Sequence, residues 1–328
     1  MNSKEEPPLV SVVTPVYNGQ SHLHECIESI LAQTYTHWDY TIVNNCSTDR
    51  TLEIVLEYAA KDCRIRVENN KNFVPIVKNY NNAFRQISPA SKYCKVVGAD
   101  DWLFPECLEK MVRLAEEHPS VIVVQAYRLI GTKVCGDGLP YPSTVIRGRD
   151  ACRMWLQSET LSIFGSSTTL MYRSDMVRSR YSFFKESNLH SDTEVCLEFL
   201  EDHDYGFVHQ VLSFQRARDD GNTSYTQTFG TMLPGRLYHL IAYGPKFLAK
   251  EESGRSISKQ FAAYYDYLGW QVFKKRGREF WRFHERELAL LGYPMSKARV
   301  ALHAFQYILI LIMSPMRILA RLTNRNAI

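Results

Sequence analysis

The chain has 328 residues, of which 45% are hydrophobic and 23% charged, a balance that excludes an intrinsically disordered protein and allows a sizeable core. The net charge is +4, yet residues 274–328 contain 11 Lys and Arg against 3 Asp and Glu, so the rest of the chain is mildly acidic. A basic C-terminal segment indicates an anionic surface as its partner.

Eight cysteines are scattered along the chain without a CxxC pair, which argues against a zinc site. Residues 1–8 are short and polar, so we expect no secretory leader before the first strand. A reducing, cytoplasmic location is therefore expected.

Strand and helix patterns alternate through the first 125 residues. Leu9–Tyr17 is apolar and β-branched and predicts a buried strand stopped by Pro15. The pattern continues with a helix at 23–31, a strand at 40–43, a helix at 52–58, a strand at 65–67, a helix at 74–87, a strand at 93–97, a helix at 107–117 and a strand at 121–125. Such alternation predicts an α/β fold with a mainly parallel sheet flanked by helices.

Towards the C-terminus long helical patterns replace this alternation, so we expect a body at residues 1–235 and a helical extension at residues 236–328. The last apolar stretch, Val300–Leu322, carries Arg317 and Arg321, and its uninterrupted apolar part is far shorter than the roughly 20 residues of a spanning helix. It predicts an interfacial helix whose basic side chains reach lipid head groups. Packing on its own domain or on a second subunit, as in a homo-oligomer, stays open, as does a true membrane span.

Three polar clusters directly follow predicted strands, namely Tyr17-Asn18, Asn44–Asp49 and Gly98–Asp101. Ligands of parallel sheets bind at the carboxyl ends of the strands, so these clusters are expected along one edge. The adjacent carboxylates of Asp100 and Asp101 form a hard-oxygen site suited to Mg²⁺ or Mn²⁺, which would neutralise a diphosphate leaving group. An Asp-Asp pair alone is more often a solvated turn or a helix cap, so the position after a buried strand carries the interpretation.

Four motifs, in this order, resemble the family 2 glycosyltransferases of the GT-A fold: Val10–Asn18, Cys26–Tyr35, Val43–Thr51 and Gly98–Trp102. The resemblance is weak after residue 130 and fades beyond Arg218. It implies a GT-A fold and an inverting enzyme that uses Mn²⁺ or Mg²⁺ to move a sugar from a nucleotide-diphosphate donor to a saccharide or lipid-linked saccharide. Synthesis of cell-envelope polysaccharide or lipopolysaccharide is the setting that the family implies. The helical extension predicts docking to the inner face of the cytoplasmic membrane, where a lipid-linked acceptor would lie.

The resemblance also implies roles for single residues. Asp101 would ligate the metal, and Asp100 would bond the ribose or the donor sugar. Asn45 stands where many members have an aspartate that reads the uracil edge, and an amide both donates and accepts, so the base stays open. The remaining positions expected at the nucleotide sugar are Pro15, Tyr17, Asn18, Asp49, Lys78, Asn79, Arg216 and Arg218.

Several of these positions have a structural alternative. Asp49 equally suits the cap of the helix that follows it, Lys78 and Asn79 suit a solvated helix face, and the two arginines suit an ordinary charged surface.

Inversion needs a base that deprotonates the acceptor hydroxyl. His190–Leu200 resembles the acidic motif of the family at the start of a helix, with Asp192 as the expected base and Glu194 as the alternative. Asp192 also suits a simple helix cap.

Other functions fit less well. The sequence lacks the glycine-rich, basic phosphate loop of a nucleotidyltransferase and the GxGxxG of a dehydrogenase, and its basic tail has no nucleic-acid recognition motif. A non-catalytic nucleotide-sugar or carbohydrate-binding protein on the same fold is the alternative. Against it stand Asp100, Asp101 and Asp192, the carboxylates that the chemistry requires.

Overall fold

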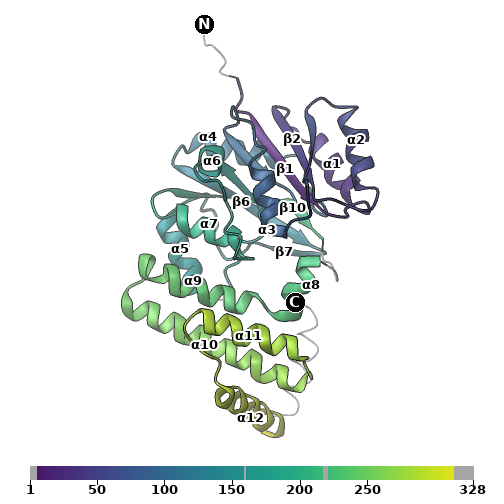
Figure 1. Ribbon diagram of the computed structural model, residues 1–328. Helices are drawn as coiled ribbons and strands as arrows, with labels where there is room; N and C mark the ends of the chain where they lie inside the picture. The colour runs from purple at the N-terminus through teal and green to yellow at the C-terminus, as the bar shows by residue number, and fades with distance from the viewer. Residues whose placement is uncertain (1–5, 159, 217–220, 314–328) are drawn as a thin grey trace. The chain divides into compact units, whose positions relative to one another are not determined.

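The computed structural model describes residues 6–158, 160–216 and 221–313 (Figure 1). It contains two compact units, Met1–Ala217 and Arg218–Ile328. The boundary expected after residue 235 falls inside helix α9 (Met232–Phe247), which lies entirely in the second unit. The second unit also holds α8 (Gly221–Phe229), so the chain is helical from Gly221 onward, where the sequence gives only a polar pattern.

A ten-stranded sheet forms the first unit, in the order β3-β2-β1-β4-β9-β6-β10-β5, with β7 beside β6 and β8 beside β10. The neighbours β3, β2, β1 and β4 run parallel, as do β6 and β10, which confirms the expected α/β class. The strands are β1 (Val10–Val16), β2 (Trp38–Asn44), β3 (Ile65–Asn69), β4 (Tyr93–Val96), β5 (Trp102–Leu103), β6 (Val121–Ile130), β7 (Lys133–Cys135), β8 (Val145–Arg147), β9 (Leu170–Arg173) and β10 (Asp204–Gln215).

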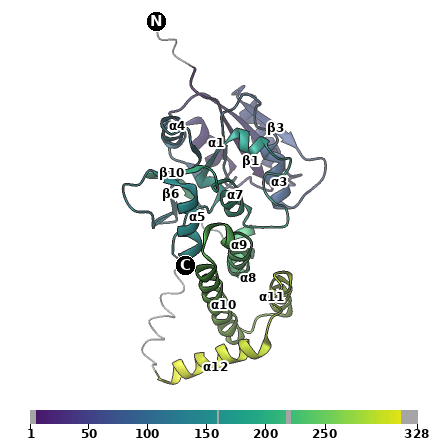
Figure 2. The same cartoon turned by 90° about the vertical axis from the view of Figure 1, so that its left-hand side faces the viewer.

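Helices flank this sheet on both faces (Figures 1 and 2). They are α1 (Leu23–Leu31), α2 (Thr51–Ala59), α3 (Ile76–Phe84), α4 (Cys107–Glu117), α5 (Gly148–Gln157), the 3₁₀ turn η1 (Ser167–Thr169), α6 (Ser174–Arg178) and α7 (Ser191–Phe199). Alternate residues of β1 and β2 pack against α1, α2 and α4 because side chains of a strand alternate between its faces.

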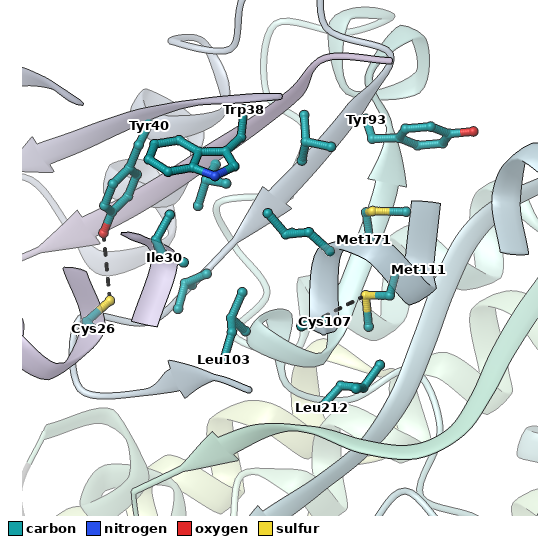
Figure 3. Packing of buried hydrophobic residues seen from close by; sticks show 14 of the residues in the cluster. Cys26, Ile30, Trp38, Tyr40, Tyr93, Leu103, Cys107, Met111, Met171 and Leu212 are labelled. Carbon is teal, nitrogen blue, oxygen red and sulfur yellow. Dashed lines mark hydrogen bonds between the residues drawn. The ribbon is translucent and has the colours of Figure 1, made fainter. Parts of the chain in front are cut away.

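The buried core includes free thiols that behave as small apolar groups. In Figure 3 Cys26 of α1 meets Tyr40 of β2, and Cys107 lies beside Met111 within α4. The eight cysteines are all free, which agrees with the absence of a paired-cysteine pattern in the sequence. The hydroxyl groups of Tyr40 and Thr14 hydrogen-bond to each other at 2.9 Å, so these two buried groups are satisfied within the core.

Two strand predictions are corrected by the structure. β1 does not stop at Pro15 but continues to Val16, because proline removes only its own N–H and the Val16 carbonyl still accepts from the Asn45 amide at 2.8 Å. β6 runs to Ile130 rather than ending near residue 125, since β10 pairs with it as far as Ile130 and β7 pairs with Arg128–Ile130.

The second unit is helical, with α10 (Lys250–Phe273), α11 (Arg278–Leu290) and α12 (Lys297–Met313) after α8 and α9. Its core joins aromatic residues of α10 and α11 to Leu237 of α9 and Val300 of α12. α12 runs across α10 (Figure 2) and approaches it most closely at Gly269, where an added Cβ would lie 2.8 Å from the Ala304 nitrogen. Among the described residues no helix is both long and apolar enough to span a bilayer. The expected basic residues Arg317 and Arg321 lie outside the described residues.

Candidate active site

The loops after β1 and β2 meet at the carboxyl edge of the sheet because these strands are parallel neighbours. Asn18 has a left-handed backbone (φ 50°), and its side-chain oxygen accepts from the Thr48 amide at 2.8 Å. Asp49 accepts from the amides of Gln20 at 3.1 Å and Thr51 at 3.0 Å. Burial raises the pKa of Asp49, but these hydrogen bonds and that of the Thr51 hydroxyl lower it more, so the carboxylate is charged and anchors both loops. Its contact with a nucleotide stays a prediction.

Asn45 is buried, and its amide is committed to the backbone of Val74. Its nitrogen donates to the Val74 carbonyl at 2.8 Å, and its oxygen accepts from the Val74 amide at 3.0 Å and from Asn70 at 2.8 Å. Asn70 donates in turn to Asn79 at 2.7 Å, which places Asn79 inside the same network rather than on a solvated helix face. An aspartate at position 45 would lack the donor that Val74 requires.

Two exposed aromatic rings stand at this edge. Tyr17 and Phe73 are 49% and 61% exposed, and their rings meet edge to face with centroids 4.9 Å apart. Phe73 directly precedes Val74, so the Asn45 network holds this pair in place. Exposed aromatic faces beside polar loops are suited to stacking on a planar ligand such as a nucleobase.

The carboxylates of Asp100 and Asp101 converge above Gly98 at the end of β4. A Cβ added at Gly98 would lie 3.0 Å from an Asp101 oxygen and 3.3 Å from an Asp100 oxygen. Asp101 is buried and accepts from the Thr168 hydroxyl at 2.5 Å and from the Arg216 amide at 3.2 Å. Burial, and then the charge of Asp100, raise the pKa of Asp101 to about 7 despite these donors. A cation between the two groups would relieve that repulsion.

Lys95 of β4 supports the residues that surround Asp101. Its buried ammonium donates to the Thr168 carbonyl at 2.5 Å and to the Leu170 carbonyl at 3.2 Å, and burial lowers its pKa. The Thr168 hydroxyl donates to Asp101 and accepts from the Gly98 amide at 3.0 Å. Lys95 therefore positions Thr168, and through it Asp101.

Arg216 lies against the Asp-Asp motif, where a residue at the donor diphosphate is expected. Its guanidinium pairs with Glu25 at 2.5 Å, donates to the Asp100 carbonyl at 3.4 Å and lies 5.4 Å from the ring centre of Trp102. Arg218, expected beside it, lies outside the described residues.

Asp192 and Glu194 lie in the first turn of α7 but have different surroundings. Glu194 is buried and bound by Lys185 at 3.3 Å and Asn188 at 2.8 Å, a structural environment. Asp192 accepts from the Thr193 amide at 2.8 Å, and burial raises its pKa against the charges of His190 and Arg128. A carboxylate with a raised pKa is the better proton acceptor. The role of Asp192 as the base stays a prediction.

Arg128 and Tyr80, which sequence reasoning missed, lie among the same carboxylates. Arg128 of β6 is 9% exposed and donates to the Gly165 carbonyl at 3.3 Å, while its buried Nε has no hydrogen-bond partner within the described part of the chain. Its charge lowers the pKa of Asp101 and Asp192, against the larger effect of burial. Tyr80 of α3 has its pKa raised by burial and then by the charges of Asp101, Asp100 and Asp192.

The other expected site residues are placed differently. Pro15 is buried within β1 and precedes the loop that was expected to touch the nucleoside, so its own contact with a nucleoside stays a prediction. Lys78 is exposed on α3 next to the buried Asn79. The contacts of Lys78 and Asn79 with a nucleotide sugar stay predictions.

Comparison with known proteins gives the family. The sequence pattern of Glycosyl transferase family 2 matches residues 11–177, half of the chain and the part that holds β1 to β9. The chain belongs to glycosyl transferase family 2. This confirms the resemblance seen in the four motifs, and the chain is a glycosyltransferase.

Relatives of this family 2 glycosyltransferase include EpsE and TuaG of Bacillus subtilis (strain 168). EpsE, named as a glycosyltransferase, is 26% identical over 232 residues, which cover 68% of this chain and 77% of EpsE. TuaG, named for teichuronic acid biosynthesis, is 31% identical over 133 residues, or 40% of this chain and 50% of TuaG.

Solved structures share the fold. S. aureus TarS 1-349, in complex with UDP-GlcNAc, superposes with a TM-score of 0.57 at 18% identity and covers 77% of this chain and 71% of that one. The mannosyltransferase PcManGT of Pyrobaculum calidifontis, in complex with GDP-Man and Mn²⁺, gives a TM-score of 0.55 at 13% identity and covers 93% of this chain and 86% of PcManGT. These likenesses confirm the GT-A fold class.

Proposed function

We propose that this chain is an inverting glycosyltransferase that uses Mn²⁺ or Mg²⁺ and a nucleotide-diphosphate sugar. Its acceptor is a saccharide or a lipid-linked saccharide of the cell envelope, met at the inner face of the cytoplasmic membrane. One observation carries the proposal: at one edge of the sheet, the carboxylates of Asp100 and Asp101 converge over Gly98, and Arg216 lies against them. The nucleotide sugars and the Mn²⁺ named for TarS and PcManGT support it.

The donor set suits a hard divalent cation. Among the described residues no group of three or more His, Cys, Asp or Glu side chains is placed to hold a metal. Asp101, with Asp100 beside it, would therefore hold the ion together with diphosphate oxygens and water, the ligands that Mg²⁺ prefers. When bound, such an ion supplies charge neutralisation of the departing diphosphate.

The remaining chemistry falls to side chains of the chain itself. Asp192 takes the proton of the acceptor hydroxyl as the acceptor oxygen bonds to the anomeric carbon from the face opposite the diphosphate. The bond from that carbon to the phosphate oxygen breaks, and the nucleoside diphosphate leaves with the electron pair. Arg216 stabilises the charge on the leaving phosphates. Tyr17 and Phe73 hold the base, and the Asn45 network keeps that pair in place.

The base assignment is tested with two variants of α7. Asp192→Asn should keep donor affinity while transfer falls by about 10² to 10⁴, as general-base loss does. The product anomer, read by NMR, should be opposite to that of the donor. Glu194→Gln serves as the comparison, since its neighbours Lys185 and Asn188 indicate a structural role. Retention of configuration would exclude the inverting mechanism, and full transfer by Asp192→Asn would exclude Asp192 as the base.

A further inference from the structure

The second unit contains an apolar groove that the transferase chemistry does not use. It lies between the end of α10, α11 and α12 and has a volume of about 580 Å³, within the usual size of a ligand site. Its walls are formed by Phe273, Trp281, Met295, Val300, Phe305 and Ile308. Exposed apolar patches on a folded protein are candidate sites for binding.

The side chains at its mouth are unusually exposed for apolar residues. Phe305 is 56% exposed, and Phe273 and Ile308 are 41% and 39% exposed. α10 and α12 cross closely at Gly269, and beyond that crossing Tyr307 of α12 packs on Trp270 of α10 with ring centres 5.4 Å apart, while Phe305 and Ile308 line the groove.

Basic side chains lie in this groove and next to its residues in the sequence. Lys274 and Lys275 directly follow Phe273 and are exposed, and Lys297 lines the groove itself, where Glu285 is the acidic member. Arg299 lies one turn before the exposed part of α12, with its guanidinium over the Tyr265 ring at 4.6 Å. Apolar side chains with lysines at their border are the pattern of a surface that enters the head-group region of an anionic bilayer.

The charge also argues against a second copy of the chain as the occupant. In a two-fold pair each groove would meet the same surface of its partner, so the lysines at the two grooves would face one another. Like charges across an interface oppose association, and lysine is depleted from subunit interfaces. An anionic membrane has the complementary charge.

We propose that this groove receives an acyl chain of an anionic phospholipid bilayer while Lys274, Lys275 and Lys297 meet the head groups. The groove uses the first part of the apolar stretch Val300–Leu322 that the sequence suggests for membrane contact, and adds residues of α10 and α11 to it. It goes beyond the transferase proposal, because vesicle binding is measured without donor or acceptor, so either proposal can fail while the other stands.

Vesicle binding with two matched variants of α12 tests the groove. Phe305→Glu places a charge in its wall, and Leu302→Glu makes the same change on the same helix at 54% exposure but outside the groove. On vesicles of phosphatidylglycerol and phosphatidylcholine in equal parts, Phe305→Glu should weaken partitioning about tenfold or more, and Leu302→Glu should not. Lys274→Gln and Lys275→Gln should each weaken it about fivefold, and vesicles of phosphatidylcholine alone should bind poorly.

Contact with the acyl chain itself is read from Trp281. Phospholipid brominated at mid-chain should quench tryptophan emission of the full chain, and Trp281→Phe should remove most of that quenching. Equal loss of binding by Phe305→Glu and Leu302→Glu, or quenching that persists in Trp281→Phe, would overturn the proposal. So would a dimer in sedimentation that Phe305→Glu dissociates, since the groove would then hold a second copy.

Discussion

Replacement of His284 by Gln should remove a large part of the acid sensitivity of the second unit. His284 of α11 is fully buried among Phe280, Phe283 and Tyr264, whose hydroxyl lies 2.6 Å from its Nδ1. Burial lowers the pKa of His284 from 6.5 to about 4, and a backbone hydrogen bond at Phe229 opposes this only in part. The folded unit therefore keeps the imidazole neutral.

The sign and size follow from these two values. The unfolded chain takes up a proton near pH 6.5, while the folded unit does not until about pH 4, so stability is present above 6.5 and is lost as the pH falls towards 4. At pH 5 the loss amounts to about 2 kcal/mol relative to pH 7.5. That is a considerable share of the stability of a small helical unit.

Hydrogen exchange measures this loss without requiring the two units to unfold together. The opening free energy of the slowest amides of α10 and α11 should fall by about 2 kcal/mol more in the wild type than in His284→Gln between pH 7.5 and pH 5. Glutamine keeps an oxygen for the Tyr264 hydroxyl, so the difference reports titration rather than a lost contact. Equal pH dependence of the two proteins would refute the reasoning.

Three further predictions concern the first unit. Arg128→Met should lower kcat by a factor of about 10² to 10³ with little change in the melting temperature, and Arg128→Lys should keep part of the activity that Arg128→Met loses. A wild-type kcat in Arg128→Met would exclude Arg128 from the site. Asn45→Asp should weaken binding of the nucleotide sugar by about 1–3 kcal/mol, because the Val74 carbonyl loses its hydrogen-bond donor. Calorimetry showing tighter binding of the nucleotide sugar would contradict this. Lys95→Met should leave the Thr168 and Leu170 carbonyls buried without a hydrogen-bond donor, which should destabilise the unit by about 1–3 kcal/mol in urea unfolding. An unchanged urea midpoint would contradict this.

The order of elements in the first 130 residues could be predicted because apolar periodicity and strand-end polarity act locally. β9 (Leu170–Arg173) could not, since this short strand is inserted antiparallel between β4 and β6, a choice made by tertiary pairing. The extent of β6 was missed for the same reason: its last residues pair with β10 on one side and β7 on the other, so the strand continues to Ile130.

The residues of the candidate site could be predicted where a sequence motif contains them. They could not be predicted where only packing of distant elements brings them together. Asp100 and Asp101 follow a strand in sequence, but Arg128 and Tyr80 join them only through the folded arrangement of β6 and α3. The sequence contains one signal of a buried polar cluster beside these carboxylates. Lys95 lies inside an apolar strand, where a charged residue needs buried partners. The carbonyls of η1 and β9 are those partners.

Calorimetric titration of a panel of UDP-, dTDP-, GDP- and CMP-sugars, with Mn²⁺ and with EDTA, tests the central claim most directly. It should be run on the wild type, on Asp101→Ala and on Asp175→Ala, an exposed carboxylate of α6 that serves as the control. We predict that one nucleotide class binds with Mn²⁺, that chelation and Asp101→Ala both weaken it, and that Asp175→Ala does not. Binding that is indifferent to EDTA and to Asp101→Ala, or no binding of any donor, would contradict a metal-dependent nucleotide-sugar site at this edge of the sheet.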